Sequence, residues 1–192
     1  RNACLSLLAA GDPVLGRQLA KAQFDAGRNM TDVLAALGVL SGLDGAERTQ
    51  ALAAFHAAWQ ADALVLDKWF AIQAMSSLPG TLDAVRALTA HPDFDLRNPN
   101  RVRSLVVSFS SANQVRFHAA SGAGYDFLAE MIMRIDPANG QLAARMVAPL
   151  GQWKRFDPAR QQKVRTALTM IADQKGLSAN TFEMVSKSLK QE

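Results

Sequence analysis

The sequence has few of the residues on which disulfide scaffolds and side-chain catalysis depend. Its 192 residues include one cysteine, three histidines and one tyrosine. Because Cys4 has no second cysteine to pair with, an internal disulfide framework is excluded. A single free cysteine also fits a reducing compartment, and we therefore expect a cytoplasmic location.

Long apolar runs are lacking as well. The longest uncharged stretches, such as residues 33–43, fall well short of the ~20 apolar residues that a membrane helix needs, so no membrane partner is expected. With 49% hydrophobic and 20% charged residues, the chain is too apolar for a disordered tail. We expect one domain over residues 1–192, and its start at Arg1 instead of Met leads us to expect a fragment of a longer protein.

Charge is divided unevenly along the chain. Up to Leu96 there are 7 Lys and Arg against 10 Asp and Glu, whereas from Arg97 onward there are 14 against 7. A basic half is typical of a protein with an anionic partner such as nucleic acid, and equally of one with an acidic neighbouring domain. Composition does not distinguish an anionic partner from an acidic neighbouring domain.

Apolar residues recur with the 3.6-residue period of an α-helix in nearly every segment. The stripes are Val33, Leu37 and Leu40; Leu52, Phe55 and Trp59; Val65, Trp69 and Ile72; Leu82, Val85 and Leu88; Val102, Val106 and Phe109; Leu128, Met131 and Ile135; and Val164, Leu168 and Ile171. They predict an all-α fold of about ten to twelve short antiparallel helices. Because no fixed repeat recurs, we predict an irregular superhelical stack of the armadillo or HEAT type. The predicted N-caps are Thr31, Asp44, Thr81 and Asp157.

The histidines do not form a metal-binding pattern. His56, His91 and His118 lie 35 and 27 residues apart, so no pair has the i,i+4 spacing of a His-Glu-x-x-His zinc helix. We predict that the chain has no metal ligands. His56 is expected on a partly exposed helix face and His91 at a helix end, and His118 lies in a loop-like region.

Other candidate chemistry has a simpler structural interpretation. Gly122 and Gly124 follow no strand and precede no Lys-Ser/Thr pair, so a loop with close backbone packing is favoured over a phosphate cradle. Asp67 and Lys68 could supply an acid and a cation, but a surface pair on a helix is the expected role. We predict no catalytic residues.

Two groups of basic residues remain. The densest is Lys154, Arg155, Arg160, Lys163 and Arg165, which is typical of a solvated helix face and, as the alternative, of a nucleic-acid site. The other comprises Arg101 and Arg103, two helical positions that point about 200° apart, so that burial of the Val102 stripe prevents both from facing water. Arg103 and Arg145 lie on the shoulders of apolar stripes, where an arginine either covers apolar surface or offers donors to a carboxylate or carbonyl in a cavity.

An ordered set of short motifs resembles the C-terminal helical domain of the bacterial aminopeptidase N (alanyl aminopeptidase) family of zinc metallopeptidases. The motifs are NMTD at 29–32, LAAL at 34–37, LVLDKWF at 64–70, NPNRVRSL at 98–105, FH at 117–118, GAGY at 122–125, AR at 144–145, PL at 149–150, RFD at 155–157 and RQ at 160–161. Each is weak alone, but the order and spacing are specific. Ser121 stands where relatives often have an acid, and residues 41–60 and those after Asp173 match less well.

The resemblance implies a piece of an enzyme. The family's catalytic domain binds zinc through His-Glu-x-x-His and a distant Glu, and none of that occurs in this chain. The chain would be a non-catalytic lid that packs on the catalytic domain and encloses the substrate cavity, with zinc only in the parent's catalytic domain. By the resemblance, Arg103 and Arg145 would face the cavity and contact the peptide. The partners would be that domain and the peptide, with no nucleic acid; the alternative is a free-standing helical scaffold that binds a protein or nucleic acid.

Overall fold

A computed structural model describes residues 1–190 of the chain, and in these residues the fold is all-helical, with no strand. The elements are α1 (Asn2–Gly11), α2 (Pro13–Ala26), α3 (Met30–Ser41), α4 (Ala46–Trp59), α5 (Ala63–Ala74), α6 (Thr81–Leu88), α7 (Pro99–Val102), the π-helix η1 (Arg103–Ala112), α8 (Gln114–Phe117), α9 (Ala123–Ile135), α10 (Gly140–Met146), the 3₁₀ turns η2 (Ala148–Leu150) and η3 (Trp153–Arg155), α11 (Pro158–Ala172) and α12 (Ala179–Lys190). The predicted class and helix number are confirmed. Residues 191 and 192 of the predicted domain lie outside the described part.

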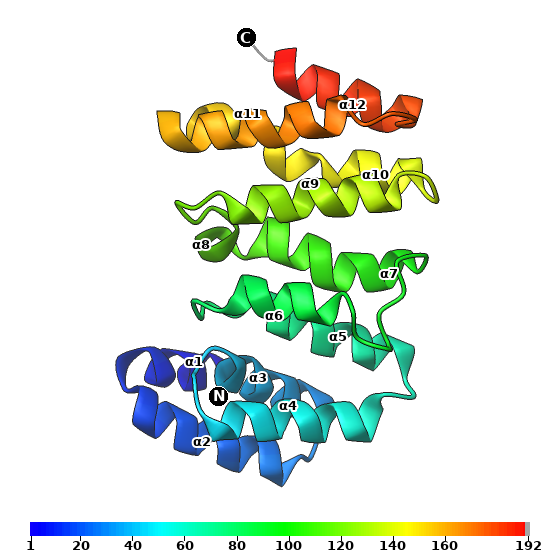
Figure 1. The fold of residues 1–192 in the computed structure, drawn as a ribbon. Coiled ribbons are helices and arrows are strands. Elements are labelled where there is room, and N and C mark those ends of the chain that lie inside the picture. Colours follow the sequence, from blue (N-terminus) through cyan, green and yellow to red (C-terminus); the bar gives the residue numbers. More distant parts are fainter. Residues whose placement is uncertain (191–192) are drawn as a thin grey trace.

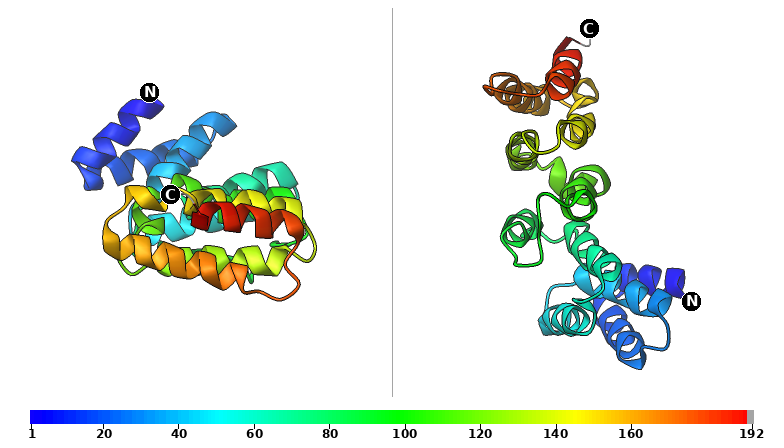
Figure 2. Two further views of the ribbon diagram at one scale, coloured as in Figure 1. Left: turned by 90° about the horizontal axis from the view of Figure 1, so that it is seen from above. Right: turned by 90° about the vertical axis from the view of Figure 1, so that its right-hand side faces the viewer.

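The helices stack along one direction, with the termini towards opposite ends (Figure 1). From α4 onward they form two layers, as the right-hand view of Figure 2 shows: α4, α6, α9 and α11 in one layer, and α5, η1, α10 and α12 in the other. Neighbours in the stack contact each other, for example α5 with η1 and α9 with α11. Helices α1–α3 pack on one another at the N-terminal end, where α3 also contacts α4 and α5.

Most of the predicted stripes form the core. Leu37, Phe55, Val106, Leu128 and Leu168 are all at most 2% exposed and belong to one hydrophobic cluster. The exception among the stripe residues is Trp59, which is 39% exposed at the last turn of α4. None of the described helices is long and apolar enough to cross a membrane.

The predicted helix starts are correct at one position out of four. Asp157 caps α11, because its side chain accepts the backbone N–H three residues later at 3.0 Å. In contrast, α3 begins after Asn29, whose side-chain oxygen accepts the N–H of Asp32 at 2.9 Å, two residues before the predicted cap Thr31. Asp44 and Thr81 are not N-caps either, since glycines precede α4 and α6.

The helix that carries Arg101 and Arg103 widens after its first turn. It starts as α7 and continues as η1, whose i→i+5 hydrogen bonds give a turn of slightly more than four residues. Positions four apart therefore share the buried face, as seen at Arg101, Leu105, Phe109 and Asn113. Arg103, half a turn from Arg101, is on the exposed side.

The Gly122–Gly124 loop has the predicted close packing. Gly122 has φ +80°, a conformation that suits glycine, and a Cβ on Gly124 would come within 2.4 Å of the carbonyl oxygen of Phe117. We expect Gly124→Ala to lower the free energy of unfolding by about 1–3 kcal/mol in chemical denaturation, because backbone has to move. Gly11→Ala is the matched control, since its Cβ would meet nothing within 4 Å. Equal effects of the two substitutions would contradict this explanation.

Candidate functional site

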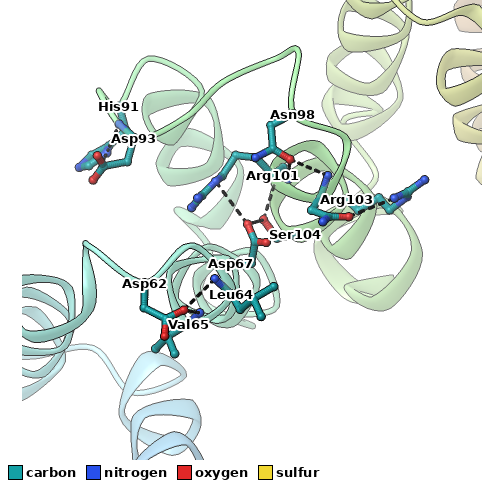
Figure 3. Close-up of polar contacts among 11 residues, drawn as sticks. Asp62, Leu64, Val65, Asp67, His91, Asp93, Asn98, Arg101, Arg103 and Ser104 are labelled. Carbon is teal, nitrogen blue, oxygen red and sulfur yellow. Dashed lines mark hydrogen bonds and ion pairs between the residues drawn. The ribbon is translucent and has the colours of Figure 1, made fainter.

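The candidate site is built on the start of α7, next to α5 (Figure 3). Asn98 caps α7, because its side-chain oxygen accepts the N–H groups of Asn100 and Arg101 at 3.0 and 3.3 Å. Pro99 follows at the first helical position, where its fixed φ suits a helix and its missing N–H costs nothing. This cap fixes where the arginines that follow it point.

Arg101 is buried, with only 5% of its surface exposed. Its Nε lies 3.3 Å from Oδ1 of Asp67 on α5, and its guanidinium carbon lies 4.9 Å from the ring centroid of Phe70. The hydroxyl of Ser104 is 3.4 Å from the same Asp67 oxygen. Asp67 is thus not the predicted surface partner of Lys68, because its carboxylate turns towards α7 and neutralises a buried cation.

Arg103 points away from this pair, as Figure 3 shows. Its side chain is exposed, and Nη1 donates a hydrogen bond to Oδ1 of Asn100 at 3.2 Å. The expectation that Arg101 and Arg103 cannot both face water is confirmed. The remaining donors of Arg103 face solvent and could bind a carboxylate or carbonyl in a fork geometry.

Arg145 lies near the end of α10 and is exposed. It lines a hollow of about 320 Å³ between α10 and α12, together with Gln141, Ala144, Asn180, Glu183 and Met184. α10 and η1 belong to the same layer of the stack (Figure 2), so Arg103 and Arg145 come from one layer. Arg103 does not belong to the residues that line the hollow at Arg145.

His118 has a packing role. Its Nδ1 lies 3.0 Å from the hydroxyl of Tyr125, and its ring packs against the tilted ring of Phe156 with centroids 4.4 Å apart. Burial lowers the pKa of His118, and the nearby Arg160 cation lowers it further, so the neutral imidazole is favoured. A hollow of about 450 Å³ adjoins this histidine.

The basic group at residues 154–165 is partly used within the fold. Arg160 Nε donates to the carbonyl oxygen of His118 at 2.8 Å, and Lys163 Nζ donates to the carbonyl oxygen of Ala120. These two cations are therefore not the freely solvated stripe expected from their helical positions. Their hydrogen bonds connect α11 to the loop before α9. Fewer donors of this basic group are therefore free to bind a phosphate backbone.

The spacing of the histidines did not predict a cluster that the fold creates. His56 on α4 places Nε2 at 2.7 Å from Oδ2 of Asp93, in the turn after α6. His91 Nδ1 lies 3.6 Å from the same oxygen, and one ligand atom from each of the three residues lies within 4.8 Å of the others. The signal in the sequence was the His91-Pro92-Asp93 turn, which holds two ligand types two residues apart.

A family model described as "Domain of unknown function (DUF3458_C) ARM repeats" matches residues 1–190. The chain belongs to this ARM-repeat family. The match agrees with the predicted armadillo-like stack and with the two layers of helices in Figure 2.

Proteins similar to this member of the ARM-repeat family include three bacterial proteins named aminopeptidase N. The identity is 44% for that of Caulobacter vibrioides, 42% for that of Haemophilus influenzae and 40% for that of Escherichia coli. Each alignment covers 98% of this chain but 22% of the relative, as a C-terminal part of it. The predicted resemblance to the C-terminal helical domain of that family is confirmed.

A solved structure agrees with these relatives. The crystal structure of Legionella pneumophila aminopeptidase A in complex with aspartic acid superposes with a TM-score of 0.93 at 31% identity. The superposition covers 100% of this chain and 22% of that one. The chain thus spans about a fifth of the length of the aminopeptidases that it matches.

Proposed function

We propose that this chain is the non-catalytic C-terminal lid domain of a zinc-dependent aminopeptidase N, an enzyme that removes N-terminal residues from peptides. One observation carries the proposal: nearly the whole chain aligns, at 40–44% identity, with only 22% of three aminopeptidases N. The catalytic zinc would be held by the rest of the parent enzyme, where it would activate the water that attacks the first peptide bond. The single cysteine supports a cytoplasmic location for this enzyme.

The N-terminal end of the stack is suited to docking on the catalytic domain. Apolar side chains on α1 and α2 are exposed there, namely Leu7 (74%), Leu8 (45%), Val14 (68%), Leu15 (39%) and Leu19 (41%). A concentration of exposed apolar side chains on neighbouring helices is typical of an interface. The preceding part of the parent chain would join at this end. The covalent connection and the exposed apolar side chains would then hold the domain in place together.

Arg103 and Arg145 would face the peptide. Both are exposed, both come from the layer that contains η1 and α10, and both have guanidinium donors that are free for a carbonyl or carboxylate. By the resemblance to the aminopeptidase N family, their contacts would fall beyond the residue that is removed. Longer peptides would then use these arginines, and single-residue amides would not.

The test is Arg103→Ala in the full-length parent enzyme. We expect kcat/KM for a tetrapeptide to fall about 10-fold or more, which corresponds to the loss of one charge-assisted hydrogen bond. The value for an alanyl chromogenic amide should stay within about twofold, because that substrate ends before the arginine. Arg145→Ala should show the same dependence on peptide length.

Arg97→Ala is the matched control. Arg97 is also exposed and lies on the same segment, but it pairs with Asp95 two residues away and has no proposed role in the cavity. Arg97→Ala should leave kcat/KM unchanged for both substrates. Equal losses for peptide and amide in Arg103→Ala would contradict the cavity role and leave only a general effect on the enzyme.

A further inference from the structure

We infer that His56, His91 and Asp93 bind one divalent transition-metal ion of the zinc type. Two imidazole nitrogens and one carboxylate oxygen are a ligand set that such ions favour, and a water would complete the coordination. The three residues come from α4 and from the turn after α6, which the fold brings together at one seam. The inference is independent of the proposed aminopeptidase role, because that role locates its zinc outside this chain.

The distances suit a small ion. Ligand atoms about 2.1 Å from a tetrahedral zinc are about 3.4 Å apart. His91 Nδ1 and Asp93 Oδ2 are already separated by 3.6 Å, whereas His56 Nε2 and the same oxygen are separated by 2.7 Å. A shift of the Asp93 carboxylate by less than an ångström would therefore lengthen the His56–Asp93 separation to the value that the ion needs.

The surroundings support a site with one open side. The ring of Trp69 lies behind the cluster, with its centroid 4.7 Å from that of His56 and 5.3 Å from that of His91. Apolar walls of this kind limit water and strengthen the metal–ligand interaction. The side chains of His56, His91 and Asp93 are nevertheless 21%, 27% and 33% exposed, so an ion and its water can enter from solvent.

Two hydrogen bonds compete with the ion. The His56 ring hydrogen-bonds to the Asp93 carboxylate, and the backbone N–H of Asp93 donates to His91 Nδ1 at 3.2 Å. Metal binding would replace both hydrogen bonds, because the ion would bind to the same nitrogen and oxygen atoms. The bound ion would connect α4 to the turn after α6 and stabilise the seam between them.

The experiment titrates Zn²⁺ into the chelator-stripped chain without an affinity tag and with Cys4→Ser, so that the single thiol does not bind metal. Calorimetry should give one ion per chain, and Mg²⁺ should not bind measurably. At a free Zn²⁺ concentration about 100 times the Kd, Tm should rise by roughly 5–10 °C. His56→Gln and Asp93→Asn should each weaken binding by about 100-fold or more, which exceeds the usual effect of an outer-shell residue.

Asp95→Asn is the matched control, because Asp95 is an exposed carboxylate two residues from Asp93 that contacts only Arg97. It should bind Zn²⁺ like the unmodified chain. A second measurement needs no substitution: paramagnetic Co²⁺ should broaden the indole N–H signal of Trp69 and leave that of Trp153, in η3 against α11, sharp. Unchanged affinity in His56→Gln and Asp93→Asn, or no saturable binding, would overturn the inference.

Discussion

Asp67→Ala is expected to lower the free energy of unfolding by about 3–5 kcal/mol, because it leaves Arg101 buried without a counter-charge. Arg101 is 5% exposed, and its Nη1 already has no hydrogen-bond partner among the described residues. Asp67 is therefore the charge that makes the burial of this guanidinium tolerable. Denaturant unfolding followed by circular dichroism measures the loss.

Two further variants separate the buried charge from a general effect on the helix. Arg103→Ala, two residues away and exposed, should change the free energy of unfolding by less than about 0.5 kcal/mol. The double variant Asp67→Leu/Arg101→Met should recover most of the stability, because it removes both charges and keeps apolar volume. A loss of under about 1 kcal/mol in Asp67→Ala would show that Arg101 reaches water.

The same pair links stability to the candidate site. Asp67 on α5 contacts both Arg101 and Ser104 and so holds the first turns of α7 and η1 against α5. Arg103 lies between these two residues in the chain. If the arginine contacts a peptide, its position depends on this support. Asp67 variants of the parent enzyme should therefore also weaken the preference for longer peptides at temperatures where the domain is still folded.

Local patterns made the helices predictable. A stripe such as Leu128, Met131 and Ile135 depends only on the helical period, and all three residues are buried. The opposite directions of Arg101 and Arg103 followed from the same geometry. Trp59 extends the Leu52 and Phe55 stripe by period but is 39% exposed, because it lies at the end of α4, where no neighbouring helix covers it fully.

Long-range contacts were not predictable from spacing. His56 and Asp93 are 37 residues apart, as are Asp67 and Ser104, and nothing in either local sequence specifies the partner. Such pairs depend on how helices stack, which is determined by packing over the whole core. The π-helix that begins at Arg103 was not predicted either, because the apolar stripe of Val102, Val106 and Phe109 also fits the period of an α-helix.

Asp136→Ala is the second substitution with a large expected effect, about 3–5 kcal/mol of unfolding free energy. Asp136, 4% exposed at the end of α9, accepts the backbone N–H of Ser178 at 2.7 Å and the hydroxyls of Ser178 and Thr181 at 2.6 and 2.5 Å. It thereby fixes the start of α12 from 42 residues away. Its removal leaves the backbone N–H of Ser178 without its acceptor, which adds a desolvation cost to the lost hydrogen bonds, whereas the hydroxyl of Thr181 still has the carbonyl oxygen of Gly140 at 3.2 Å. Asp173→Ala, an exposed carboxylate at the end of α11, is the control and should change little.

The pH dependence of a second substitution, Asp136→Asn, gives a sharper test. Burial raises the pKa of Asp136, but the hydrogen bonds from Ser178 and Thr181 outweigh it and leave the pKa below the ordinary value of 3.8. A carboxylate with a lowered pKa stabilises the fold above its unfolded pKa, and that contribution is lost as the pH falls through the folded pKa. The difference between the unmodified chain and Asp136→Asn should thus be constant from neutral pH down to about pH 5 and then shrink. A difference that persists unchanged to pH 2 would mean that the ionised carboxylate is not what stabilises α12.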